Sequence, residues 1–134
     1  MRPATLADAC RRIIAGEPEA RAVAECLDSF YLAASPAERL AILAEEPPLT
    51  GRPDVDAYIG AIAEYLAKRH ALPQVPEWAG KAVRYLAEPW FAGGAEADGL
   101  REFLVYSSPA EFRSRKLFVE ARPLRRARTP REAA

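Results

Sequence analysis

Apolar side chains repeat at helical spacing along most of the chain. Residues 4–15 carry them three and four positions apart and are followed by Gly16, which predicts a first helix. Pro18 suits the first turn of a second helix, which should extend to about residue 31. The longest amphipathic stripe predicts a helix over residues 54–71, and we expect this helix to be the central buried element.

Two identical Ser-Pro-Ala-Glu segments, residues 35–38 and 108–111, each predict a helix start. The serine can cap the amide three residues on, the proline occupies a position whose N–H is not needed, and the glutamate can reach back. The first segment should open a helix to about residue 45, and the second a helix through Lys116. Because their flanks differ, we interpret them as shared helix-start chemistry and not as a repeat.

Proline and glycine interrupt this pattern. Residues 46–53 hold three prolines and a glycine, which predicts an ordered loop or hinge. A fifth helix is expected to begin near Glu77 and to end before the Pro-Trp-Phe loop of residues 88–94, and a sixth is expected around residues 100–105. Residues 117–119 are a short apolar segment that suits an extended conformation. Together these elements predict an all-α protein.

The length favours one domain. The 134 residues, half of them hydrophobic, predict a single compact domain of six or seven helices over residues 1–127, followed by a disordered basic and polar tail over 128–134. No apolar run approaches the roughly 20 residues of a membrane span, and no secretory signal is recognisable, so we expect a cytoplasmic protein without membrane contact. Cys10 and Cys26 lack metal or redox spacing and are expected to be small buried hydrophobes.

Residues suited to catalysis are scarce. With one histidine and two distant thiols, the sequence predicts no metal site, no cofactor and no catalytic residue, and therefore a protein that is not an enzyme. His70 is expected at the end of its helix, where it interacts favourably with the helix dipole. The carboxylates of Asp54 and Asp56 are expected to cap helix ends.

The net charge of zero conceals an asymmetry. Residues 1–112 hold 11 basic against 17 acidic side chains, or −6, whereas residues 113–131 hold 8 basic and only one acidic side chain, or +7. This basic end can bind an acidic partner surface, the chain's own acidic body, or nucleic acid. The nucleic-acid alternative is a transcriptional regulator that uses residues 100–131, with a helix-turn-helix order and four candidate contacts at Arg122, Arg125, Arg126 and Arg128.

The leading prediction is a non-enzymatic protein-binding module that recognises a protein partner or forms a homo-oligomer. Exposed aromatic anchors and orienting charges would supply the contact. The candidate anchors are Trp90, Phe91 and Phe118, and the candidate orienting residues are Arg113, Arg115 and Lys116. The sequence leaves open whether Trp78 and Trp90 pack in the core or form an interface.

Several strings also carry a family resemblance. They are residues 43–53 with the helix that follows, the Pro-Trp-Phe segment at 85–91, the Ser-Pro-Ala-Glu-Phe-Arg segment at 108–115, and the apolar residues 117–119. Over about residues 35–127 the chain resembles a family of small helical bacterial proteins of actinobacterial type that has no established activity. Members of that family are encoded beside nucleotidyltransferase-like toxins, so the resemblance implies an antitoxin-like or chaperoning partner role.

Overall fold

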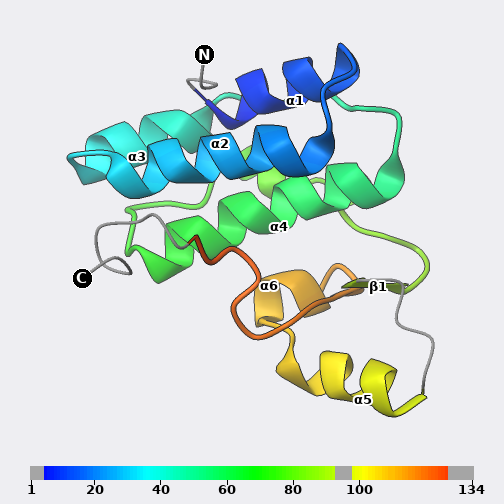
Figure 1. The fold of residues 1–134 in the computed structure, drawn as a ribbon. Helices are drawn as coiled ribbons and strands as arrows, with labels where there is room; N and C mark the ends of the chain where they lie inside the picture. The colour runs from blue at the N-terminus through cyan, green and yellow to red at the C-terminus, as the bar shows by residue number, and fades with distance from the viewer. Residues whose placement is uncertain (1–4, 93–97, 127–134) are drawn as a thin grey trace.

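The protein is built mainly of helices, as Figure 1 shows. The computed structural model describes residues 5–92 and 98–126. In chain order, with η for a 3-10 turn, the elements are α1 (Leu6–Ile14), α2 (Glu19–Leu32), α3 (Pro36–Ala44), α4 (Pro53–Arg69), η1 (Glu77–Gly80), η2 (Ala82–Arg84), β1 (Trp90–Phe91), α5 (Asp98–Ser107), α6 (Ala110–Arg113) and β2 (Leu117–Phe118). The predicted all-α class and single domain are confirmed. None of the helices within these described residues is long and apolar enough to cross a bilayer.

Helix α4 is the centre of the fold, as its amphipathic stripe predicts. In Figure 1 it runs between α1, α2 and α3 on one side and α5, α6 and β1 on the other. Ten of its residues are buried, and Val55, Ile59, Ile62 and Leu66 are at most 1% exposed. Because helices on both sides pack on α4, its burial supplies a large share of the apolar area removed from water.

The first Ser-Pro-Ala-Glu segment forms the predicted cap. The Ser35 hydroxyl accepts a hydrogen bond from the Glu38 amide at 3.2 Å, and Pro36 is the first residue of α3. The Glu38 carboxylate reaches back to the Ala34 amide at 2.7 Å, one residue further than a standard capping box requires.

The second Ser-Pro-Ala-Glu segment has a different role, so the prediction of the same cap and of a helix through Lys116 is wrong. The Ser108 hydroxyl accepts from the Val119 amide at 2.8 Å, and Glu111 is buried and paired with Arg69. Helix α6 ends at Arg113, and the chain turns into β2 through Lys116, whose φ is +64°. Tertiary contacts to β2 and α4 have replaced local helix capping.

The prediction of a helix from Glu77 onward is also wrong. Residues 77–84 form the two short turns η1 and η2, joined by Lys81 in an extended conformation. Side-chain contacts to other elements fix these turns: the Trp78 indole donates to the Leu43 carbonyl at 3.0 Å, and Arg84 donates to the Pro47 carbonyl at 2.8 Å. These long-range bonds outweigh the helical preference of the segment.

A short parallel strand pair closes the C-terminal half. β1 pairs with β2 in the register Trp90 to Leu117 and Phe91 to Phe118, so residues 117–118 are extended as predicted, whereas the strand at Trp90 was not expected. Beyond β2 the chain returns to α2, where the Tyr31 hydroxyl donates to the Leu124 carbonyl at 2.9 Å. This return brings residues 119–126 beside α2 and forms one side of the site described next.

Candidate binding groove

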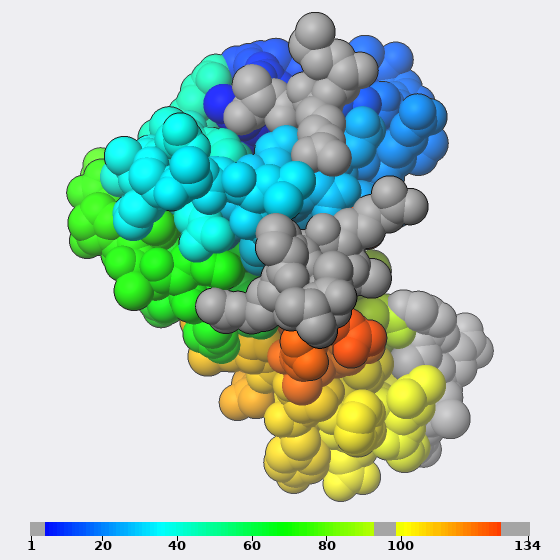
Figure 2. All heavy atoms as spheres, turned by 60° about the vertical axis from the view of Figure 1, so that its left-hand side comes forward, coloured from blue at the N-terminus to red at the C-terminus, as the bar shows by residue number. Residues whose placement is uncertain are grey.

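An open groove of about 580 Å³ lies between α2, α4 and the C-terminal half of the chain. Figure 2 shows the surface hollowed between α2 and α5. It is lined by Val23 and Leu27 of α2, by Tyr58 of α4 and by several apolar side chains of the C-terminal half. Those of the C-terminal half are Trp90, Leu100, Leu104, Leu117, Val119 and Leu124. A concave, largely apolar site with a few polar groups is the usual form of a binding pocket.

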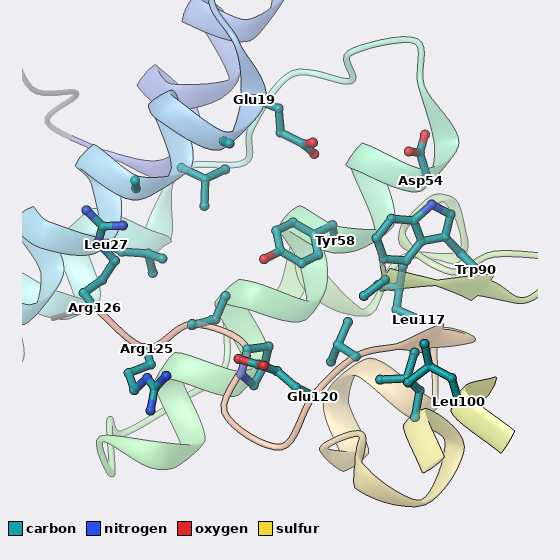
Figure 3. A pocket seen from close by; sticks show the side chains of 18 residues that line it. Glu19, Leu27, Asp54, Tyr58, Trp90, Leu100, Leu117, Glu120, Arg125 and Arg126 are labelled. Atoms are coloured by element: carbon teal, nitrogen blue, oxygen red, sulfur yellow. The ribbon is translucent and has the colours of Figure 1, made fainter. Parts of the chain in front are cut away.

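Charged side chains stand at opposite ends of this groove. In Figure 3, Glu19 and Asp54 lie on one side, above the rings of Tyr58 and Trp90, whereas Arg125 and Arg126 lie on the other. Burial raises the pKa of Glu19, and the neighbouring charge of Asp54 raises it further, while Arg52 lowers it. The groove therefore has an acidic end with two carboxylates, whereas at the opposite end Arg125 and Arg126 lie with the carboxylate of Glu120 on the same side.

Tyr58 lines the groove between these ends in the view of Figure 3. Burial raises its pKa to about 12, and the carboxylates of Glu19 and Glu120 add to the shift. The phenol is therefore neutral at physiological pH, so it can donate a hydrogen bond but cannot act as a base.

The predicted aromatic anchors are divided between two faces of the small sheet. Paired residues of β1 and β2 share a face, so Trp90 and Leu117 line the groove while Phe91 and Phe118 lie together on the other face. The two phenylalanine rings stack at 5.1 Å, and the guanidinium of Arg101 lies 5.0 Å from the Phe91 ring. The structure thus places Trp90 in the groove and the two phenylalanines outside it. Trp78, in contrast, is part of the core.

Arg115 cannot orient a partner, and that prediction is wrong. Its side chain is 1% exposed and donates to the Glu64 carboxylate at 2.6 Å, to the Glu111 carbonyl and to the Ala79 carbonyl. Its guanidinium also lies 4.5 Å from the ring of Tyr85. Arg115 therefore joins α4, α6 and η1 in the interior.

The other two predicted orienting residues lie at the surface but support the local backbone. Arg113 donates to the Ser108 carbonyl at 2.7 Å and to the Tyr106 carbonyl, and Lys116 donates to the Ala87 carbonyl at 2.8 Å. A role for Arg113 and Lys116 in partner binding stays a prediction.

The basic residues of the nucleic-acid alternative are also spread apart. Arg126 pairs with Asp28 of α2 at 3.0 Å, Arg125 lies at the groove, and Arg122 is exposed; Arg128 lies outside the described residues. The expected recognition helix is reduced to the four residues of α6, about one turn, which is too short to follow a major groove. Nucleic-acid binding by the basic end in another geometry stays a prediction.

Sequence reasoning missed an apolar face on α5. Leu100, Phe103 and Tyr106 are 49%, 60% and 76% exposed, while Leu104 on the same helix is buried. Residues three apart are neighbours on a helix, so these three form a continuous stripe, called here the α5 face. Leu100 also lines the groove, so groove and α5 face are one connected apolar surface. The signal was present in the sequence, because apolar residues cover more of this helix than a single buried face needs.

The cysteines, the histidine and Asp56, which lie outside the groove, are buried or make contacts that stabilise the fold. Cys10 and Cys26 are free and buried, as predicted, and burial raises the pKa of each thiol to about 12. His70 caps the C-terminal end of α4, and its Nδ1 lies 3.2 Å from Arg39. In the described ranges, no group of three or more histidine, cysteine or carboxylate side chains is arranged to hold a metal ion. Asp56 lies near the start of α4, as expected, but does not cap it: its carboxylate accepts hydrogen bonds from the amide and hydroxyl of Thr50, both at 2.9 Å, and so holds the preceding loop.

Comparisons of the chain with protein-family models, with curated proteins and with solved structures found no match. The family resemblance therefore stays a prediction.

Proposed function

We propose that this protein is a non-enzymatic protein-binding module whose binding surface consists of the groove and the α5 face. The observation that carries the proposal is their continuity: the apolar lining of the groove extends through Leu100 onto Phe103 and Tyr106. A small molecule would fill the groove and leave the α5 face uncovered. A polypeptide is long enough to fill the groove and also to cover the α5 face.

The residues on this surface suit a protein interface. Aromatic residues are enriched among the side chains that dominate binding energy, and Trp90, Phe103 and Tyr106 supply three of them. The antitoxin-like role that the resemblance implies is one form of such a module. Its partner would be identified by the purification described next.

The test begins with purification of the full chain from cells that express it naturally. A stoichiometric partner is then purified, and its Kd is measured against the wild type and the double variant Phe103→Glu/Tyr106→Glu. Losing two central aromatic contacts costs about 2 kcal/mol or more, so the Kd should rise at least about 30-fold.

The control is Ile14→Glu, which places a glutamate at a 53% exposed apolar residue of α1, outside the proposed surface. This variant should bind as the wild type does. Recovery of the protein as a monomer without a stoichiometric partner would overturn the proposal, and so would equal Kd values for the double variant and the wild type.

A further inference from the structure

Two carboxylates and two aromatic rings lie together at the acidic end of the groove. Glu19 lies in the first turn of α2 and Asp54 in the first turn of α4, and both line the groove. Tyr58 lies one helical turn after Asp54, and Trp90 reaches the same place from β1. Figure 3 shows both carboxylates on the side of the groove where the two aromatic rings lie. Two helices and a strand thus bring two carboxylates and two aromatic rings to one position.

The charges at this position are only partly balanced within the chain. Among the described residues, Asp54 pairs with Arg52, whose guanidinium is 3.8 Å away and more than half exposed. Burial raises the pKa of Glu19; the charge of Arg52 lowers it, and the smaller effect of Asp54 raises it. Two carboxylates thus share one exposed guanidinium, and a cation entering the groove would gain an opposite charge in a partly desolvated site.

The aromatic rings favour the same kind of group. A cation above the face of a tryptophan or tyrosine ring is attracted by the ring electrons, and the effect grows as water is excluded. Beyond the rings the lining includes the apolar side chains of Val23, Leu27 and Leu104. The fitting group is therefore a positive charge carried on an apolar body.

Resting on the proposed function, we infer that the acidic end of the groove selects a lysine or arginine side chain in the bound segment of the partner. The cationic head lies between Glu19 and Asp54, against the rings of Tyr58 and Trp90, and the apolar residues next to it in the partner pack along the rest of the groove. The partner segment is thus apolar, with a basic residue at one end.

The experiment is a selection of random 12-residue peptides displayed on phage against the immobilised full chain. Three proteins are used in parallel: the wild type, the double variant Glu19→Gln/Asp54→Asn, and Ala20→Trp, which places a large ring in the groove. The wild type should enrich apolar peptides that share a lysine or arginine at one position. For a selected peptide, replacing that residue by norleucine should weaken binding about tenfold.

The acidic-end variant should lose this preference, so that the basic peptide and its norleucine form bind alike. A matched control, Asp8→Asn, removes a first-turn carboxylate from α1 outside the groove and should keep the preference. Circular dichroism of each variant confirms that it is folded.

The possible failures are distinguishable. Enrichment of apolar peptides without a shared basic residue, blocked by Ala20→Trp, would overturn this inference and leave the proposed function standing. Enrichment that Ala20→Trp does not alter, or no enrichment with any of the proteins, would overturn both.

Discussion

Replacing Gly60 by alanine should destabilise the protein, although alanine normally stabilises a helix interior by about 1 kcal/mol relative to glycine. Gly60 lies on α4 where the side chains of two buried arginines cross it. A Cβ atom there would lie 2.9 Å from the Cβ of Arg84 and 3.3 Å from the Nε of Arg115. The Cβ of Arg84 is fixed by its own backbone and cannot rotate away, so the clash has to move η2 or α4.

The magnitude follows from three contributions. Overpacking of a filled interior costs about 1–3 kcal/mol. Moving Arg84 also weakens its hydrogen bonds to the Pro47 and Asp56 carbonyls, at 2.8 and 3.3 Å, which adds on the order of 1 kcal/mol. After the helix-propensity gain of about 1 kcal/mol is subtracted, the free energy of unfolding of Gly60→Ala should fall by about 2 kcal/mol.

Urea titration followed by circular dichroism measures this change, and the melting temperature should fall by about 6 °C. The control is Gly99→Ala on α5, where no atom lies within 4 Å of the added Cβ. That variant should match the wild type or exceed it by up to about 1 kcal/mol. If Gly60→Ala were as stable as Gly99→Ala, the close packing of the two arginines on α4 would be refuted.

Two further predictions concern ionisable groups. Cys10 and Cys26 should not react with a thiol reagent at pH 8 in the folded protein, since their raised pKa of about 12 keeps them protonated. Both thiols should react in urea. Rapid labelling of the native protein would contradict their burial. Burial opposes the charged form of Glu64, but hydrogen bonds from Lys68 and Arg115 outweigh it and hold the pKa below its usual value. The stabilisation from Glu64 is therefore complete above the unfolded-state pKa of about 4.3 and is lost as the pH falls through the lower folded-state value. Urea titrations across this range should show a smaller acid-induced loss of stability for Glu64→Gln than for the wild type.

The elements that sequence predicts well are those whose signals are local. The helical periodicity and the breakers around α1 to α4 lie within short stretches of chain, and the structure reproduces these helices closely. Ser35 caps its helix with atoms three residues away. The predicted central position of α4 was equally accessible, because a long apolar stripe has to be covered by other elements.

The elements that sequence misses are fixed by distant partners. Ser108 has the same three following residues as Ser35, yet it bonds to Val119, eleven residues on, because β2 comes close to it. Residues 77–84 have a helical pattern, but Trp78 and Arg84 bond to the loop around residues 43–47 instead. No local pattern contains this information, and propensity yields to tertiary contacts.

The groove shows the same division. Trp90 could be selected from the sequence as an aromatic side chain in a loop, whereas Glu19 and Asp54 could not be connected, since they are 35 residues apart and each suits an ordinary helix start. Only the packing of α2 beside α4 brings them to one end of a groove. The binding surface is thus assembled by the tertiary fold, from residues that look unremarkable in their local context.

The charge asymmetry of the chain acquires a structural meaning from these contacts. Arg115 and Arg126 belong to the basic C-terminal segment, residues 113–131, and pair with Glu64 and Asp28 of the acidic remainder of the chain. Part of this segment therefore folds back and holds the C-terminal half against α2 and α4. These pairs also position one wall of the groove, because residues 119–126 lie between the two arginines or beside them. In the linear sequence these charges suggest a surface for a partner. In the folded protein, part of them instead stabilises the groove to which a partner could bind.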